Sequence, residues 1–435
     1  MKHLSFFSIL FCTSLTAQQT DYDRAWMAYT SGRYEDALTT IDRCIISDTA
    51  NYQYVFLKGK TLENLYRYDE AIAAQQKALR LNPGSTEARS ALAALYLLSG
   101  QPTISTQLYE QLATAEPQVI RWKMSWAIAL QAAGKPTDAL EQLMIVEHMD
   151  STNWLVYKNM GDCYSRIDSM RRTADCYYKA LSLYPHNRNL YGTLTRILTT
   201  HSRTEEAIVV GTEAVTIDST NVEAWKYLGV AYYQVGVADK AYEALTKTLA
   251  LGDSTFTTCS HYGVLNHHMA YYLEAEKYLV KARQIDPNDM KVMNYLADTY
   301  GYTGKAEKGL DILNEIDIIV AHTDTIGMKV NVQRGYLLRI LYRYNEAAKA
   351  FTAATKNFPK NTRNFYEVAV CFDMAFNKKQ AFEWYNRFLE KTDPNWANRK
   401  WTENDLKEYE FVGIAMDRVV SLKTDLFFEE EKKKK

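Results

Sequence analysis

Apolar residues along the chain recur three or four positions apart within short stretches, the spacing that places them on one face of a helix. The stretch that holds Trp225, Leu228 and Tyr232 is an example. Glycines and prolines such as Gly236 and Pro287 separate these stretches, and both residue types end helices. The pattern predicts short amphipathic helices throughout, and therefore an all-α fold.

A second, longer spacing orders the chain, because small residues recur every 34 positions. Nine of them keep an unbroken register, and they are Ala37, Ala71, Ser105, Ala139, Thr173, Ala207, Ala241, Ala275 and Gly309. Two more follow at Ala347 and Ala381, after one step of 38 residues. Two helices approach to about 8–10 Å only where small side chains lie at their crossing. The register therefore predicts a helix pair that is repeated eleven times.

These repeats resemble the tetratricopeptide repeat. With Trp225 taken as position 4, the signature continues at positions 7, 8, 11, 15, 20 and 24 with Leu228, Gly229, Tyr232, Gly236, Ala241 and Leu245. Position 32 carries the helix-ending prolines Pro83, Pro117, Pro185, Pro287 and Pro359. The resemblance implies a right-handed superhelical solenoid of antiparallel helix pairs. Eleven repeats then occupy residues 18–395, with a four-residue insertion near 318–326.

The array has two irregular places besides the insertion. Repeat 6 departs most from the pattern, with Gly211 at position 24, and we expect a softer joint there. After the last repeat, Thr402 and Asp405 are spaced like a capping box, so we expect a helix within 396–426 that covers the end of the array. Its apolar stripe comprises Leu406, Tyr409, Val412, Met416, Val419 and Leu422. Residues 427–435 form a charged tail that we expect to be frayed.

Residues 1–17 are typical of a secretory signal peptide, with an early basic residue, a short apolar run and the small Ala17 before the expected cut. The alternative is a lipoprotein signal with Cys12 as the lipidated residue, although Phe11 precedes it where a small residue is expected. No later apolar run is long enough to span a membrane. We expect an exported protein of the bacterial periplasm, with an outer-membrane lipoprotein or a secreted protein as alternatives.

The net charge and the absence of known motifs exclude several classes of function. The chain has 51 Lys and Arg against 52 Asp and Glu, so a net charge of −1 lacks the basic footprint of a nucleic-acid binder. The sequence contains no H-E-x-x-H, C-x-x-C or G-x-S-x-G motif, so we predict no catalytic residue, no metal and no cofactor. Cys163 and Cys176 lie on facing predicted helices, and whether they form a disulfide stays open.

A candidate binding surface follows from helical phase. Positions 2, 5, 9 and 12 of each repeat lie on a face away from the core, and in the resembling family this face lines a concave groove. Its 44 positions hold 9 Lys or Arg and 6 Asp or Glu, a net charge of +3 that favours an acidic partner. The residues predicted to contact a partner are Arg121, Lys158, Arg196, Lys226, Tyr233, Lys291, Lys329, Tyr336, Arg339 and Arg363.

The resemblance implies a non-catalytic scaffold that binds a protein or peptide in this groove. The alternatives are an enzyme with its acid and base groups spread over the groove, or a protein that binds a small molecule or glycan. The two-carboxylate clamp of chaperone-binding relatives needs Lys at position 5 and Asn at position 9 of one repeat. Lys158 and Lys226 are instead followed by Asp162 and Val230, so binding of chaperone tails is not predicted.

Overall fold

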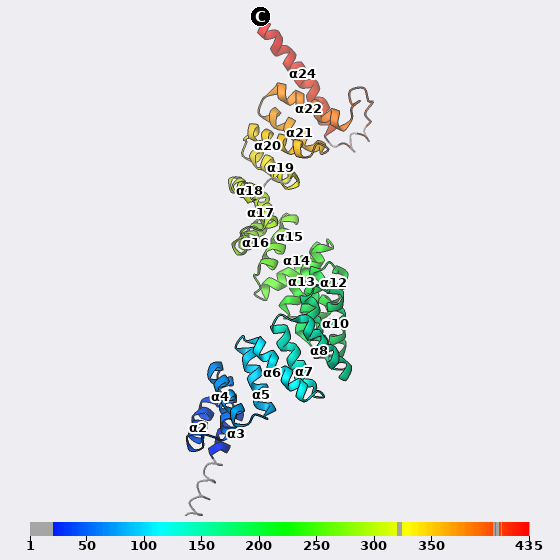
Figure 1. Ribbon diagram of the computed structural model, residues 1–435. Coiled ribbons are helices and arrows are strands. Elements are labelled where there is room, and N and C mark those ends of the chain that lie inside the picture. The colour runs from blue at the N-terminus through cyan, green and yellow to red at the C-terminus, as the bar shows by residue number, and fades with distance from the viewer. Residues whose placement is uncertain (1–20, 320–323, 403–404, 406–408, 410, 435) are drawn as a thin grey trace, which may run out of the picture. The chain divides into compact units, whose positions relative to one another are not determined.

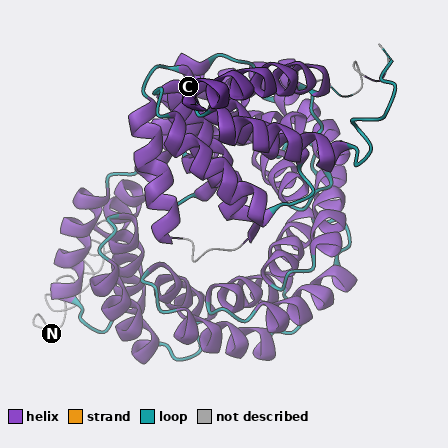
Figure 2. Ribbon diagram, turned by 90° about the horizontal axis from the view of Figure 1, so that it is seen from above, coloured by secondary structure: helices purple, strands orange, loops and turns teal. Residues whose placement is uncertain are grey.

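A computed structural model describes residues 21–319, 324–402, 405, 409 and 411–434. Helices make up most of this part of the chain, and it contains no strand (Figure 2). The chain divides into two compact units, Met1–His201 and Ser202–Lys435, which are described separately below. The predicted signal peptide, residues 1–17, lies outside the described residues.

The N-terminal unit is a succession of helices, each packed against the next (Figure 1). Residues 21–30 are helical. The helices that follow are α2 (Tyr34–Ser47), α3 (Tyr52–Asn64), α4 (Tyr68–Leu81), α5 (Thr86–Leu98), α6 (Pro102–Ala115), α7 (Ile120–Ala132), α8 (Pro136–Met149), α9 (Trp154–Arg166), α10 (Met170–Leu183) and α11 (Arg188–Thr200).

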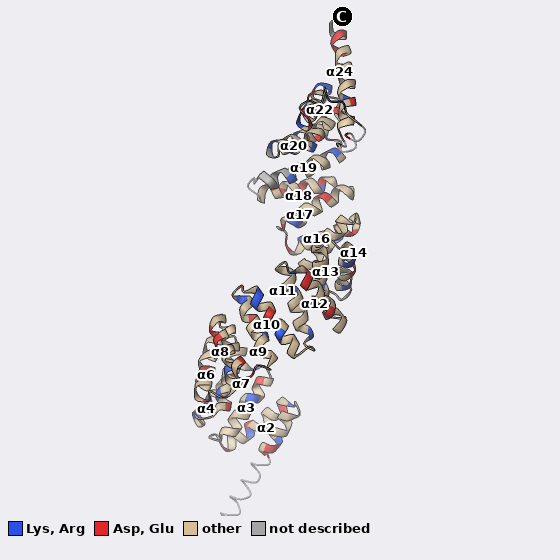
Figure 3. Cartoon of the chain, turned by 90° about the vertical axis from the view of Figure 1, so that its right-hand side faces the viewer, with Lys and Arg blue, Asp and Glu red and all other residues tan. Residues whose placement is uncertain are grey.

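The C-terminal unit repeats the same arrangement (Figure 1). Its helices are α12 (Thr204–Ile217), α13 (Val222–Gln234), α14 (Ala238–Ala250), α15 (Phe256–His268), α16 (Tyr272–Ile285), α17 (Met290–Tyr302), α18 (Ala306–Ile319), α19 (Asp324–Ile340), α20 (Tyr344–Asn357), α21 (Thr362–Met374), α22 (Lys378–Thr392) and α24 (Val412–Lys434). The first helices of successive pairs also contact each other, since α13 packs on α15, α15 on α17 and α17 on α19. They form one continuous face of the unit. Acidic and basic residues are interspersed along the helices of both units (Figure 3).

Helix ends follow from local chemistry. The first helices of several pairs begin after a residue whose side chain accepts a hydrogen bond from a free backbone amide, as Asn51, Ser85 and Asp289 do. Five second helices stop two residues before a proline, and α16 ends at Ile285 before Pro287 in this way. Proline fits this helix end because it cannot donate the amide that would continue the helix, but α2, α8 and α12 end at the same repeat position without it.

Each helix pair is joined at position 15 by a residue in the left-handed region. Glycine fills this place in five repeats, as at Gly236 with φ 78°. Six repeats use another residue, namely Tyr66, Asp168, Ser202, Ala270, Tyr342 and Phe376, with φ between 57° and 61°. Only glycine adopts this conformation without steric cost, so these six turns are strained.

Glycine at position 8 allows the two helices of a pair to approach. A Cβ added to Gly161 would lie 2.4 Å from the ring of Tyr177, and one added to Gly335 would lie 2.6 Å from the ring of Phe351. Both rings come from position 24 of the same repeat and are buried. The predicted need for small residues at the crossing is therefore confirmed.

The C-terminal end differs from the expected boundaries. Helix α19 has 17 residues against 13 in α17, so the four-residue insertion takes the form of one added turn, and residues 320–323 of the predicted site lie outside the described residues. The backbone amide of Thr402 donates to Asp405, as a capping box requires, but the long helix α24 begins only at Val412 and continues to Lys434. The charged tail is therefore helical as far as Lys434. Salt bridges from Lys378 to Asp425 and Glu429 help to hold it.

Candidate functional site

The first helices of the C-terminal unit enclose a pocket of about 640 Å³. Helices α17 and α19 form two walls, and the start of α21 forms the third. The lining residues are Lys291, Asn294, Tyr295, Asp298, Lys329, Val332, Gln333, Tyr336, Asn361, Arg363 and Asn364. The pocket therefore brings together four of the predicted residues, Lys291, Lys329, Tyr336 and Arg363, from three successive repeats.

The repeat geometry explains how these side chains converge. Helices α17 and α19 each contribute positions 2, 5, 6 and 9, which lie three or four residues apart and share one helix face. Because the two helices pack side by side, equivalent positions lie next to each other. Positions 2, 5 and 9 were predicted from helical phase, whereas position 6 was not.

Three amide side chains of the pocket have an atom without a hydrogen-bond partner in the described protein. They are Oδ1 of Asn294, Oε1 of Gln333 and Nδ2 of Asn364, all buried. Asn364 as a whole is 2% exposed. A buried polar group that lacks a partner costs about 1–3 kcal/mol, so a partner that reached these two acceptors and one donor would stabilise them.

A buried carboxylate organises the next part of the groove. Glu367 of α21 is 2% exposed. Its Oε1 accepts hydrogen bonds from the Tyr336 hydroxyl at 3.1 Å and from Nε of Arg363 at 2.8 Å, and its Oε2 accepts one from Arg339. Burial, followed by the negative charge of Glu367, raises the pKa of Tyr336. Glu367 therefore balances one of the two arginine charges, and one positive charge of this cluster remains.

Histidines and tyrosines continue the site toward α15. The Thr299 hydroxyl donates to the carbonyl of Tyr295 at 2.6 Å, so it accepts from Nδ1 of His267 at 2.9 Å. Nε2 of His267 lies 3.2 Å from the carboxylate of Asp298. Both ring nitrogens of His267 therefore lie next to oxygen atoms, one of a hydroxyl and one of a carboxylate. Burial lowers the pKa of neighbouring His268, whose ring contacts the Tyr295 hydroxyl at 3.0 Å.

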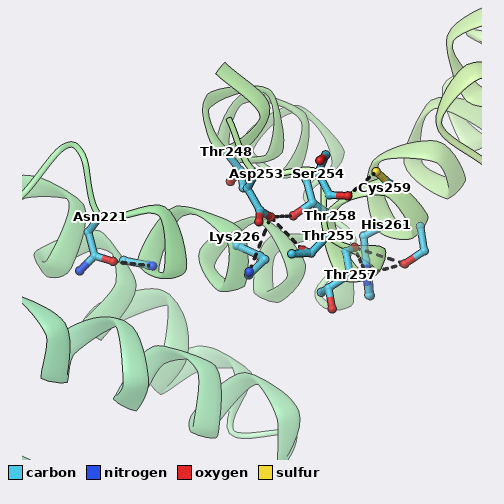
Figure 4. Close-up of polar contacts among 12 residues, drawn as sticks. Asn221, Lys226, Thr248, Asp253, Ser254, Thr255, Thr257, Thr258, Cys259 and His261 are labelled. Carbon is cyan, nitrogen blue, oxygen red and sulfur yellow. Dashed lines mark hydrogen bonds and ion pairs between the residues drawn. The ribbon is translucent and has the colours of Figure 1, made fainter. Parts of the chain in front are cut away.

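Two further predicted residues of this unit lie outside the pocket. Lys226 forms an ion pair of 3.6 Å with Asp253, which also accepts hydrogen bonds from Thr255 and Thr258 (Figure 4). This cluster joins the start of α15 to α13. The ammonium nitrogen of Lys291 lies 5.3 Å from the ring centroid of Tyr233, so Tyr233 supports one wall of the pocket.

The predicted residues of the N-terminal unit are engaged locally. Lys158 bonds to Asp162 at 2.6 Å. Arg121 lies 4.0 Å above the ring of Trp122. Arg196 is half-buried on α11, where its charge acts on Tyr177. The structure does not bring these three cations into one described pocket, and their role in binding stays a prediction.

Neither a metal site nor a disulfide is found among the described residues. The described part holds no group of three His, Cys, Asp or Glu arranged to bind a metal ion. Its five cysteines are free thiols, so Cys163 and Cys176 are not joined, and burial raises the pKa of both to about 11. Among the described helices, none combines the length and the apolar character that crossing a membrane requires.

Sequence reasoning missed the amides and the glutamate. Asn294 lies on the predicted stripe, but an amide gives no charge signal. Gln333, Asn364 and Glu367 lie off the stripe. Two partners of Glu367, Tyr336 and Arg339, come from a helix that precedes it by about thirty residues, and only Arg363 lies on the same helix. A local motif could therefore have revealed the pair of Arg363 and Glu367 but not the cluster.

The repeats of this chain are similar in sequence to those of known proteins. Two family models, both described as tetratricopeptide repeat, match this chain; one matches residues 22–86 and 334–395, and the other matches residues 65–127. The BBSome complex member BBS4 of Bos taurus is 26% identical over 69% of this chain and 58% of its own length. The peroxisomal targeting signal receptor of Candida albicans is 26% identical over 44% of this chain and 34% of its own. The chain thus spans less than two thirds of each relative.

Two solved structures are similar to parts of this chain, with low TM-scores. A tetratricopeptide repeat protein from Parabacteroides merdae ATCC 43184 gives a TM-score of 0.40 with 18% identity, over 58% of this chain and 98% of that one. MamA from Desulfovibrio magneticus RS-1 gives 0.36 with 18% identity, over 39% and 97%. The matching family models and the paired helices of both units together identify the chain as a tetratricopeptide repeat protein.

Proposed function

We propose that the chain is a non-catalytic scaffold of the bacterial cell envelope, and that the pocket between α17, α19 and α21 binds an extended segment of a partner protein. The observation that carries this proposal is the set of unpartnered amide atoms on Asn294, Gln333 and Asn364. An extended polypeptide presents alternating backbone donors and acceptors, and these would satisfy the two acceptors and the donor of the pocket.

The relatives support this class of function. One is a member of a complex, and another is a receptor for a targeting signal. The pocket offers a ligand amides and lysines, and it holds Asp298 in a pair with His267. A carboxylate held in such a pair is poorly placed to act as a general base, which favours binding over catalysis.

The expected location rests on residues 1–17 alone. We infer that the chain is exported and cleaved after Ala17. Mass spectrometry of the mature protein from an envelope fraction should find a chain that starts at Gln18. A chain that starts at Cys12 and carries a lipid would establish the alternative, and an uncut Met1 would overturn export by this signal.

The function is tested by capture from an envelope extract with three versions of the mature chain: wild type, Asn364→Leu and Asn266→Leu. Asn266 is a matched control, because it is 0% exposed and its Oδ1 also lacks a partner, yet it lies outside the pocket. Replacing either residue removes a buried unsatisfied amide atom, so neither variant should lose stability.

We expect wild type and Asn266→Leu to enrich the same envelope protein, and Asn364→Leu to lose it. Melting curves of the three chains should show that all are folded. Equal capture by all three chains would show that the partner binds outside the pocket. If folded wild type captures no protein, a glycan or small-molecule ligand becomes the better reading, because the pocket also presents Tyr295 and Tyr336.

A further inference from the structure

The turns that join the two helices of repeats 9, 10 and 11 carry an exposed row of large hydrophobic side chains. Positions 13 and 15 of these repeats hold five of them, here called the turn edge: Tyr302, Ile340, Tyr342, Met374 and Phe376. All five are exposed, from 48% at Ile340 to 90% at Phe376. The same positions in repeats 1–8 hold only Leu98 and Tyr66 as large hydrophobic residues. The row is therefore a property of the last three repeats and not of the repeat itself.

The three repeats bring these side chains together. Tyr302, Ile340 and Met374 line one pocket of about 380 Å³, together with Tyr344. The ring of Tyr344 in turn packs edge-on against the exposed ring of Tyr342, with 6.2 Å between the ring centroids. The turn edge is thus one surface that three successive repeats build.

The last helix adds two further rings at the end of this surface. Lys378 follows Phe376 by two residues and forms an ion pair of 2.8 Å with Glu429 of α24. Phe427 and Phe428, beside Glu429 in the sequence, are each 59% exposed. Exposed aromatic rings therefore continue from the turn of repeat 11 onto α24.

Backbone strain indicates that the aromatic side chains serve a contact outside the chain. Tyr342 and Phe376 have φ of 59° and 58°, in a region that only glycine adopts without steric cost. The ring of Phe376 is too exposed for its packing within the chain to offset that cost. Strained residues of this kind occur at functional sites, and a large exposed apolar patch is typical of an interaction surface.

The charge around the turn edge favours one kind of surface. Positions 13–19 of repeats 9–11 are residues 302–308, 340–346 and 374–380, and they hold five Lys or Arg against two Asp or Glu. Their net charge is +3, whereas the same positions of repeats 1–8 together have a net charge of −2. Anionic lipid headgroups attract clustered basic residues, and aromatic side chains are favoured at the level of the headgroups.

The form of the surface also favours lipid over a folded protein. A protein partner has to match the shape of the surface that it covers. A lipid interface needs no matching cavity, because headgroups and acyl chains rearrange around side chains that protrude from a turn, as Tyr342 and Phe376 do.

We propose that the turn edge of repeats 9–11 binds an anionic lipid surface. The five hydrophobic side chains enter the interface between headgroups and acyl chains, and basic residues of the same turns, such as Lys308 and Lys379, lie against the lipid phosphates. This inference goes beyond the proposed function, because the turn edge does not include the unpartnered amides of Asn294, Gln333 and Asn364.

The probes are vesicles of phosphatidylcholine alone and vesicles in which about a third of the lipid is phosphatidylglycerol. Cosedimentation with the mature chain measures the affinity for each. We expect wild type to bind the anionic vesicles at least about tenfold more tightly than the neutral ones.

The main variant is Tyr342→Gly/Phe376→Gly. Glycine is the residue that five other repeats have at position 15, so this chain should be at least as stable as wild type, and thermal unfolding checks this. We expect its affinity for anionic vesicles to fall about tenfold or more, because two aromatic rings no longer enter the interface. Tyr66→Gly is the matched control, since Tyr66 has φ 60° and is 78% exposed but lies in repeat 2. It should bind vesicles as wild type does.

A charge variant tests the same surface independently. Lys308→Glu/Lys379→Glu places acidic residues in the first turns of α18 and α22, where they suit the helix dipole, so the chain should fold. We expect about tenfold weaker binding to anionic vesicles and unchanged binding to neutral ones. Lys247→Glu/Lys356→Glu is the control, because it makes the same change of net charge at the far ends of α14 and α20. It should retain most of the affinity.

Several results would overturn the proposal. These are wild-type binding to neither kind of vesicle, equal binding to both, or equal loss of binding in Tyr66→Gly and in Tyr342→Gly/Phe376→Gly. If wild type binds no vesicle but forms dimers in sedimentation equilibrium that the double glycine variant lacks, a second copy of the chain covers the turn edge instead of lipid. Asn364→Leu should bind vesicles as wild type does, so failure of this inference leaves the proposed function standing.

Discussion

The two units use the same helix pair and differ in how their groove polar groups are satisfied. In the N-terminal unit, Lys158 bonds to Asp162, and Asp162 also accepts from the Tyr177 hydroxyl at 2.6 Å. In the C-terminal unit, Lys291 and Lys329 pair with no carboxylate among the described residues, and three amides beside them keep an unpartnered atom. We propose from this difference that the repeat supplies the scaffold, while the polar groups left unsatisfied on it decide where a ligand binds.

The largest difference between the units should appear when the buried carboxylate Glu367 and the partly exposed carboxylate Asp162 are each neutralised. Glu367→Gln removes the charge that holds Arg339 and Arg363, so we expect a loss of about 2–3 kcal/mol in the free energy of unfolding of the C-terminal unit. Asp162→Asn in the N-terminal unit should cost about 1 kcal/mol, because its partner Lys158 reaches solvent. Urea unfolding followed by circular dichroism measures both.

The substitution at Glu367 separates the effect of charge from that of packing. Glu367→Gln keeps the volume of the side chain, so a change of stability reports charge and not packing. Equal losses in Glu367→Gln and Asp162→Asn would show that the two clusters are equivalent, against the distinction drawn above.

A scaffold substitution should affect the two units alike. Gly161→Ala and Gly335→Ala each force a methyl group against a buried ring, which overpacks the helix crossing. The helix propensity of alanine offsets part of that cost, and we expect a net loss of about 1–2 kcal/mol in each unit. Thermal unfolding of the single variants measures it.

A double variant tests the stated cause. Gly335→Ala/Phe351→Leu should lose less stability than the sum of the two single changes, because the smaller side chain makes room for the methyl group. If the losses of stability in the two single variants simply add, or if Gly335→Ala loses no stability, the close approach of the two helices is not what makes glycine necessary here.

The smallest expected effect concerns the strained turns. Phe376 is 90% exposed and has φ 58°, so Phe376→Gly should relieve strain while removing little packing. We expect a gain of about 0.5–1 kcal/mol in the free energy of unfolding. Phe376→Ala is the matched control, because it removes the ring but keeps the Cβ that causes the strain. A gain of equal size in both variants would assign the effect to the ring instead.

Much of the fold could be predicted because its determinants are local or strictly periodic. Small residues at positions 8 and 20 recur through the array and set the same crossing, as Gly335 shows, and proline at position 32 marks the helix end in five repeats, as Pro287 does. The late start of α24 could not be predicted, because the capping box at Thr402 and Asp405 signals a helix start without giving its length.

The site was predicted less completely, for a physical reason. Helical phase placed Lys291 and Lys329 on the groove face, and the structure sets both at one pocket. Whether a cation is compensated depends on residues from other repeats, and Glu367 lies next to apolar residues that look like ordinary core. An unpartnered amide such as Asn364 is defined by what surrounds it in space, which a periodic pattern does not encode.

The central claim is tested most directly by photo-crosslinking from matched positions in the two units. Val332 lines the pocket, and Lys158 occupies the same repeat position in the N-terminal unit. A benzoylphenylalanine at each position, illuminated in envelope extract, reports which groove a partner occupies. We predict one crosslinked partner protein from position 332 and none from position 158. The same partner from position 158 alone would contradict the account.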